Sequence, residues 1–249
     1  MQDLAGKRAV VTGGSRGLGL GIVEALLARK ARVTVVARDA ERLARLAERL
    51  GVDVVPGDVA DESLARRVLE GVRPDVLVLN AGATPSVAPI QEQTWEGFSR
   101  TWDCDVKAGF HWVQHALRLP LTPGSRVLIS SSGAAINGSP LSGGYAGAKR
   151  MLWILAQYAN GAAKEAELGI TFQTLVPQQI IGDTELGRVA AEAYAKRKGV
   201  SVAAFLAGFG APLPPRQVGE HVLTLLSDSK YQRGVAFGLK GDTGIVCLD

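Results

Sequence analysis

A tyrosine and a lysine four positions apart are the residues with the clearest capacity for chemistry in this sequence. Tyr145 and Lys149 would share one face of a helix, because side chains at this spacing are neighbours on a helix surface. An ammonium group beside a phenol favours the deprotonated phenol, so Tyr145 could give a proton to a carbonyl oxygen or take one from an alcohol. The pair therefore predicts general acid–base catalysis at an oxygen atom.

Three consecutive serines precede this pair and follow an apolar run: Ser130, Ser131 and Ser132. A serine hydroxyl at the end of a strand could hydrogen-bond the same reacting oxygen and orient it.

A glycine-rich segment near the start of the chain could bind phosphate groups. It lies between a predicted strand and a predicted helix and reads Thr12-Gly13-Gly14-Ser15-Arg16-Gly17-Leu18-Gly19. Glycines allow the backbone to turn tightly and to approach a pyrophosphate, and the N-terminus of the helix offers unpaired N–H groups and a partial positive charge. We expect this segment to bind a dinucleotide.

The end of the second predicted strand indicates which dinucleotide binds. An NAD site usually has an acidic residue there, which binds the 2′-hydroxyl of the adenosine ribose. This strand ends in Ala37-Arg38, and Arg38 could pair with the 2′-phosphate of NADP, as could Arg16 from the other side. We therefore expect NADP(H); the alternative is that Asp39 binds the ribose of NAD.

These residues must be positioned by alternating strands and helices. Short β-branched runs predict strands at 8–12, 32–37, 52–55, 75–79, 127–130, 170–176 and 235–239. Stretches in which apolar residues recur at the spacing of a helix predict helices at 18–30, 40–50, 62–69, 94–119, 145–168 and 218–226. The alternation predicts a Rossmann-type α/β fold: a doubly wound parallel sheet in three α/β/α layers, with residues 1–249 as a single domain. Ligands of such folds bind at the carboxyl ends of the strands, so the motifs above should gather at one edge of the sheet.

Residues 182–215 interrupt this alternation and predict a lid over the substrate, because irregular segments of this kind often set specificity. The segment is rich in small and apolar residues, which include Ala191, Tyr194, Val200, Phe205, Leu206 and Phe209. These side chains favour a hydrophobic or cyclic carbonyl compound. Lys196, Arg197 and Lys198 could meet an acidic substrate or could simply be solvated.

The order and spacing of these motifs resemble the short-chain dehydrogenase/reductase family, of the single-domain type. The resemblance covers nearly the whole chain and is firm up to about Pro177. It rests on Thr12-Gly13-x-x-x-Gly17-x-Gly19, Asp58-Val59, Asn80-Ala81-Gly82, a serine after a strand, and Tyr145-x-x-x-Lys149. Ser132 lies thirteen positions before Tyr145, a spacing that favours it over Ser131 as the serine of the motif.

The resemblance implies roles for further residues of this chain. Asp58 and Val59 would flank the adenine, and Asn80, Ala81 and Gly82 would lie beside the cofactor at the end of the fourth strand. Lys149 would also bind the nicotinamide ribose hydroxyls. Pro177, the backbone near Ile180 and the side chain of Thr184 would lie in the segment that meets the nicotinamide carboxamide.

Two positions depart from the family pattern. The family often has an asparagine in the long helix, where it helps to hold a water for proton relay, and this chain has Asp105. An ionised carboxylate there could still hold water but would perturb Lys149 and Tyr145. The second departure follows Pro177, where a glycine is usual and this chain has Gln178-Gln179-Ile180.

Composition and charge exclude several other classes of protein. The formal net charge is only +4 and basic residues are interspersed with acidic ones, so we expect no nucleic-acid partner. No signal-peptide pattern and no membrane-length apolar run are present, so we expect a cytoplasmic protein without membrane contact.

The cysteines and histidines do not predict a metal site. Cys104 and Cys247 lack metal-ligand spacing, and we expect two buried, reduced thiols. His111 and His115 have a spacing that could hold zinc, but no third ligand is evident. The long helix that carries them, with its tryptophans, is expected to pack against a second copy in a homodimer or homotetramer.

The sequence thus predicts an NADP(H)-dependent oxidoreductase that moves a hydride between the nicotinamide and a carbonyl or alcohol carbon. Two alternatives stay open, because a fold does not fix a chemistry. One is a non-redox enzyme on the same scaffold, such as an epimerase or dehydratase. The other is a protein that senses NADP(H) without turnover.

Overall fold

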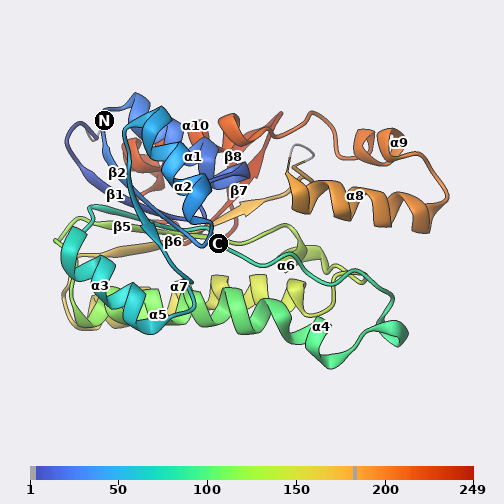
Figure 1. Ribbon diagram of the computed structural model, residues 1–249, viewed down its shortest axis with the longest axis horizontal. Helices are drawn as coiled ribbons and strands as arrows, with labels where there is room; N and C mark the ends of the chain where they lie inside the picture. Colours follow the sequence, from blue (N-terminus) through green and yellow to red (C-terminus); the bar gives the residue numbers. More distant parts are fainter. Residues whose placement is uncertain (1–3, 182–183) are drawn as a thin grey trace.

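A computed structural model describes residues 4–181 and 184–249 and has an eight-stranded sheet at its centre (Figure 1). The strand order is β3-β2-β1-β4-β5-β6-β7-β8. The first seven strands are parallel, and β8 pairs with β7 in the antiparallel direction. The strands are β1 (Arg8–Thr12), β2 (Arg32–Ala37), β3 (Asp53–Pro56), β4 (Val76–Leu79), β5 (Arg126–Ser130), β6 (Thr171–Pro177), β7 (Ala236–Lys240) and β8 (Gly244–Cys247).

Two layers of helices cover the two faces of this sheet (Figure 1). One core cluster joins the sheet to α1 (Gly17–Ala28), α2 (Ala40–Leu50) and α10 (Pro215–Ser227). A second joins the opposite face to α3 (Glu62–Val72), α5 (Lys107–Arg118) and α7 (Tyr145–Glu165). The central strands β4 and β5 are buried along their whole length, as expected for a parallel sheet covered on both faces. The predicted doubly wound, three-layer α/β fold is confirmed.

The chain reverses its direction of winding next to β1. From β1 the chain continues outward to β2 and β3, and β4 then returns to the other side of β1. In open parallel sheets, ligands bind outside the carboxyl ends of the strands at such a switch point. The loops after β1 and β4 are therefore expected to line a site.

The predicted helix at 94–119 is interrupted. It consists of α4 (Trp95–Thr101), a π-helical turn (Trp102–Val106) and α5. A π-helical turn inserts a residue into a helix and changes the direction of the side chains that follow, and such turns are frequent at functional sites. Here the turn contains Asp105, whose side chain is buried.

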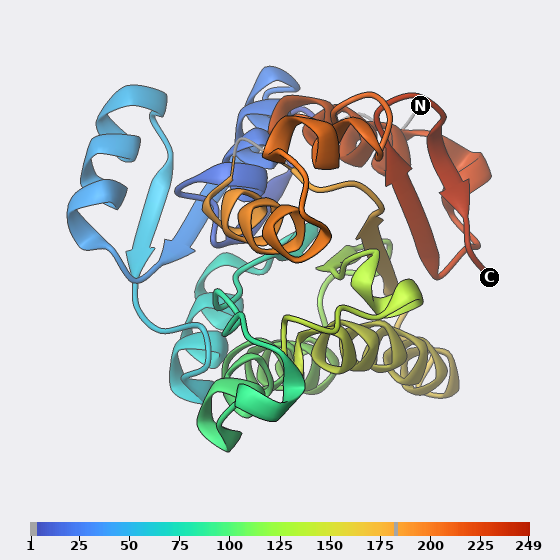
Figure 2. The same ribbon diagram turned by 90° about the vertical axis from the view of Figure 1, so that its right-hand side faces the viewer.

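The structure has further elements that the spacing of hydrophobic residues in the sequence did not predict. These are the short helix α6 (Ala134–Asn137), the strand β8, the 3₁₀ turns at Ile90–Glu92 and Ser229–Tyr231, and two helices in the expected lid, α8 (Glu185–Lys198) and α9 (Val202–Ala207). Gly182 and Asp183, the first residues of that segment, lie outside the described residues. Figure 2 shows α8 and α9 lying at the carboxyl edge of the sheet, between the two helical layers.

The expectation of two buried thiols was wrong. Cys247 is exposed because it lies on β8, the edge strand of the sheet, and Cys104 is only half-buried. Among the helices that the structure describes, none is long and apolar enough to cross a membrane.

Candidate active site

A cavity of about 880 Å³ lies at the carboxyl edge of the sheet, beside the switch point. The structure brings all of the sequence-predicted site residues to its wall. They are Gly13, Ser15, Arg16, Gly17, Leu18, Gly19, Arg38, Asp58, Val59, Asn80, Ala81, Gly82, Asp105, Ser132, Tyr145, Lys149, Pro177, Ile180 and Thr184.

The glycine-rich segment forms a cradle that side chains would fill. Gly13 has φ +67°, and a Cβ atom on it would lie 2.8 Å from the Ala81 Cα. A Cβ atom on Gly19 would lie 2.3 Å from the Gly13 carbonyl oxygen. Among the described residues no side chain caps the N-terminus of α1, so its N–H groups face this end of the cavity without a side-chain acceptor from that part of the chain. The shape and the helix dipole both suit a phosphate group.

Asn80 ties the glycine-rich segment to the middle of the sheet. Its side-chain Nδ2 donates to the Thr12 and Gly13 carbonyls, at 3.3 and 3.4 Å, and its Oδ1 accepts from the Ser130 hydroxyl at 3.4 Å. Its backbone N–H donates to the Thr12 hydroxyl at 3.0 Å. One half-buried amide thus joins the ends of β1, β4 and β5, which fixes the position of the cradle.

The charged residues of the cavity wall near the end of β2 differ in their contacts. Arg38 is exposed and has no ion-pair partner among the described residues. Asp39 caps α2 by accepting from the Arg42 N–H at 2.9 Å, and it also lies 3.5 Å from the Arg42 Nε. Arg16 forms an ion pair with Glu185 of α8. The free cation here is therefore Arg38, whereas the Asp39 carboxylate already serves as a helix cap.

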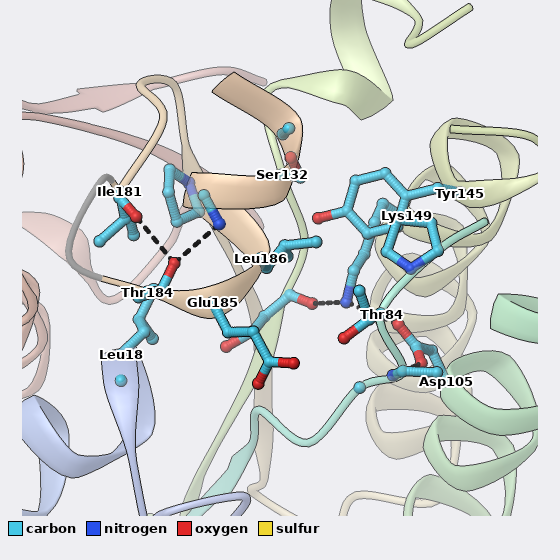
Figure 3. Close-up of a pocket in the computed structure, with 18 of the residues that line it drawn as sticks. Leu18, Thr84, Asp105, Ser132, Tyr145, Lys149, Ile181, Thr184, Glu185 and Leu186 are labelled. Carbon is cyan, nitrogen blue, oxygen red and sulfur yellow. Dashed lines mark hydrogen bonds and ion pairs between the residues drawn. The ribbon is translucent and has the colours of Figure 1, made fainter. Parts of the chain in front are cut away.

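The three serines after β5 have different surroundings. The Ser130 hydroxyl donates to Asn80, and the buried Ser131 hydroxyl donates to the Lys149 carbonyl at 2.7 Å. The Ser132 oxygen accepts from the Ala134 N–H at 3.2 Å, which leaves its own proton for another acceptor. Figure 3 shows Ser132 and the Tyr145 hydroxyl on the same side of the cavity.

Helix α7 presents Tyr145 and Lys149 on one buried face, as their spacing predicts. The Lys149 Nζ lies 5.6 Å from the centre of the Tyr145 ring and 3.4 Å from the Ser130 carbonyl oxygen. Figure 3 shows the lysine between Tyr145 and Asp105.

Asp105 forms a buried ion pair with Lys149. The Lys149 Nζ and Asp105 Oδ2 are 3.0 Å apart, and the two side chains are 7% and 0% exposed. The other carboxylate oxygen accepts from the Ala83 N–H at 2.7 Å. Burial lowers the pKa of Lys149, but the negative charge of Asp105 and the nearby Tyr145 oppose this, and the net pKa lies above the ordinary lysine value. Lys149 is therefore held as a cation by a carboxylate in direct contact.

Gly82 leaves room for the Asp105 carboxylate because glycine has no side chain. A Cβ atom at Gly82 would lie 2.8 Å from the Asp105 Oδ2. The Asn80-Ala81-Gly82 segment and the π-helical turn therefore fit together around the ion pair.

Thr184 and Gln179 organise the base of the lid. The Thr184 hydroxyl donates to the Ile181 carbonyl at 2.7 Å and accepts from the Gly187 N–H at 3.0 Å, so it caps α8 (Figure 3). The Gln179 amide donates to the Phe209 carbonyl at 2.7 Å and accepts from the Gly241 N–H at 2.6 Å. Gln179, one residue beyond the position where the family usually has glycine, thus links the end of the lid to the β7–β8 turn.

Tyr194 was expected in the lid, but its contacts were not predicted from the sequence, and neither was Thr84 as a cavity residue. Tyr194 on α8 contacts the loop before α7: its hydroxyl lies 2.9 Å from the Ser139 Oγ and accepts from the Leu141 N–H at 3.1 Å. Thr84 also lines the wall. No local motif marks these residues, because they meet only when the lid folds over the sheet.

Trp112 does not lie on a face available to a second copy, in contrast to the expectation for the long helix. It is fully buried within the chain, and its indole N–H donates to the Val59 carbonyl at 3.0 Å, which supports the segment beside the cavity. Trp95 and Trp102 are the tryptophans of this region that remain exposed. His115 is buried and lies 3.3 Å from Glu62, and no set of three metal-ligating side chains gathers within the described ranges.

Comparison with known proteins agrees with this architecture. Residues 7–195 match the family model described as short chain dehydrogenase. The 3-oxoacyl-[acyl-carrier-protein] reductase of rhamnolipid biosynthesis from Pseudomonas aeruginosa is 38% identical over 126 residues, 47% of this chain and 49% of that protein. Human L-xylulose reductase is 36% identical over 134 residues, 51% of this chain and 54% of that protein. The match thus spans about half the length of these curated relatives.

Among solved structures, a blue fluorescent protein from a metagenomic library, in complex with NADPH, has a TM-score of 0.77 and 28% identity. That alignment covers 98% of this chain and 99% of the other. The chain therefore belongs to the short chain dehydrogenase family.

Proposed function

We propose that the protein is an NADP(H)-dependent oxidoreductase that interconverts a carbonyl and an alcohol group of a small organic substrate. The observation that carries this proposal is the convergence of Ser132, Tyr145 and Lys149 on the wall of the cavity that also contains the glycine cradle. A proton donor and a dinucleotide site in one cavity are what carbonyl reduction requires.

The residues present fit an NADP molecule. The uncapped N-terminus of α1, with Ser15, Gly17 and Leu18, would hold the pyrophosphate. Arg38 would bind the 2′-phosphate, with Asp58 and Val59 beside the adenine. Pro177, Ile180 and Thr184 would border the nicotinamide end. The NADPH in the similar metagenomic protein supports this choice of cofactor.

The chain's own residues would handle the substrate oxygen. NADPH, when bound, supplies the hydride for the carbonyl carbon. The Ser132 hydroxyl would hydrogen-bond the carbonyl oxygen and orient it, and Tyr145 would give that oxygen its proton, so that the product is the neutral alcohol. Lys149 would stabilise the phenolate that remains on Tyr145 until a solvent proton replaces the one given up. In the reverse direction Tyr145 takes the alcohol proton.

Asp105 would act on this step through Lys149. A carboxylate in contact with the ammonium cancels part of the positive charge that Tyr145 experiences, and it also fixes the position of the ammonium. We therefore propose Asp105 as a positioning residue for Lys149, in place of the asparagine that the family often has.

Replacing Arg38 with alanine tests the cofactor assignment. We expect wild-type protein to bind NADPH at least about tenfold more tightly than NADH, since a charge-assisted bond to phosphate contributes roughly 1.5–3 kcal/mol. Arg38→Ala should lose most of this difference, as measured by titration calorimetry with both cofactors.

Arg45→Ala is the matched control, because Arg45 is exposed on α2, pairs with Glu41 and does not line the cavity. Equal binding of the two cofactors by the wild type, or a preference that survives Arg38→Ala, would contradict the assignment. The cytoplasmic location and the homodimer or homotetramer remain predictions.

A further inference from the structure

The lid forms an aromatic wall on one side of the cavity. Tyr194, Phe205 and Phe209 all line it. The Tyr194 and Phe205 rings are stacked with centres 6.0 Å apart and planes 8° apart, and Phe209 meets Phe205 edge-on at 5.2 Å. Such a wall suits a flat apolar body rather than a heavily hydroxylated chain.

The wall is held in place by backbone geometry and by Tyr194. Helix α8 ends at Gly199, whose φ of +65° turns the chain back so that α9 packs against α8. Phe205 is buried between the two helices with Ala191 and Ala195. The Tyr194 hydroxyl fastens this unit to the loop before α7 through Ser139 and Leu141. The aromatic residues therefore form a fixed surface rather than a loose flap.

One cation lies on this wall. The Lys198 Nζ lies 5.4 Å from the centre of the Phe205 ring, and Lys198 lines the cavity, whereas its neighbours Lys196 and Arg197 do not. Lys198 has no acidic partner within 4.0 Å among the described residues.

The other charged residues of the cavity wall are already engaged or lie at the opposite end. Lys149 pairs with Asp105, and Arg16 pairs with Glu185. The remainder belong to the adenosine end: Arg38, Asp39, Arg42 and Asp58. Among the charged cavity residues that the structure describes, Lys198 is therefore the unpaired one on the lid side, where the substrate would extend away from the nicotinamide.

We propose that Lys198 binds the carboxylate of a substrate whose aromatic or cyclic body lies against Tyr194, Phe205 and Phe209. This inference rests on the proposed function, because it assumes that the reacting carbonyl lies at Tyr145. It defines the substrate class as carbonyl or alcohol compounds with an apolar ring and an anionic end. A single partly solvated ion pair contributes modestly, so the expected effect is about five- to tenfold.

The test compares carboxylates with their uncharged methyl esters. The probes are para-formylbenzoate and its longer biphenyl homologue, each paired with its methyl ester. Two quantities are measured for each: kcat/KM with NADPH, and affinity for the NADP⁺-loaded protein by calorimetry. The variants are Lys198→Met and, as the matched control on the same turn of α8, Lys196→Met.

We expect at least one carboxylate to be bound and reduced about five- to tenfold better than its ester. Lys198→Met should remove this preference with the ester unaffected, and Lys196→Met should retain it. Three results would overturn the inference: equal kcat/KM and affinity for carboxylate and ester, a preference for the carboxylate that survives Lys198→Met, or no binding of either carboxylate.

The two proposals fail in different ways. If the esters are reduced but the carboxylates show no higher kcat/KM or affinity than their esters, the oxidoreductase proposal stands and the proposed role of Lys198 is wrong. If the carboxylates bind through Lys198 but no probe is reduced, the oxidoreductase proposal is the one in doubt.

Discussion

Tyr145→Phe is expected to lower kcat for carbonyl reduction by about 10²- to 10⁴-fold, the usual contribution of a general acid. The substitution removes only a hydroxyl from a side chain that is buried on α7, so the ring and the fold should be retained. Steady-state rates with NADPH and an aromatic aldehyde measure the effect.

Two controls accompany this measurement. NADPH affinity should change little, because the glycine cradle and Arg38 are untouched, and the melting temperature should stay near that of the wild type. A Tyr145→Phe protein that is folded, binds NADPH and keeps more than about a tenth of the wild-type rate would contradict the role of the tyrosine as the acid.

Lys149→Met is expected to lower both stability and activity, because it leaves the Asp105 carboxylate buried without its partner. Breaking a buried ion pair in this way typically costs about 3–5 kcal/mol in the free energy of unfolding. Urea or guanidinium titration measures this cost, with kcat measured beside it.

The double variant Asp105→Asn with Lys149→Met separates the two effects. It removes both charges, so most of the lost stability should return, but activity should not, since no cation remains beside Tyr145. If the double variant is no more stable than Lys149→Met, the ion pair does not have the energetic role that its burial indicates.

The same ion pair predicts a dependence of stability on pH. The pKa of folded Lys149 is raised, so its stabilising contribution is complete below the ordinary lysine value of 10.5 and is lost as the pH rises through the raised value. The free energy of unfolding should therefore fall more steeply at alkaline pH in the wild type than in the double variant, which lacks this pair.

The site could be predicted from the sequence wherever its parts are local. The glycine-rich segment combines a strand, a tight turn and a helix start within a few residues, and Tyr145 with Lys149 needs only one helix. The parallel sheet followed from the alternation of strands and helices. Its arrangement then brought these separate motifs to one edge, as expected for a doubly wound fold.

Contacts between distant segments could not be predicted in this way. The sequence raised the possibility that Asp105 perturbs Lys149, but their direct contact depends on the π-helical turn, which has no clear signal in hydrophobic period. The position of Lys198 on the cavity wall depends on how α8 and α9 fold back at Gly199. The exposure of Cys247 depends on β8 being an edge strand. A short run of apolar residues in the sequence does not indicate whether the strand that it forms lies at the edge or in the middle of a sheet.

Transfer of a deuterium label is the most direct test of the oxidoreductase proposal. NADPH that carries deuterium at both positions of its hydride-donating carbon is incubated with the protein and an aromatic aldehyde such as para-formylbenzoate or its methyl ester, and the products are analysed by mass spectrometry. We predict an alcohol with one deuterium on the carbon that bore the carbonyl, formed by the wild type and far more slowly by Tyr145→Phe. An alcohol without deuterium would show that its new hydrogen did not come from the nicotinamide, and tight NADPH binding without any alcohol would favour a protein that binds the cofactor without turnover; either result would contradict hydride transfer to these aldehydes.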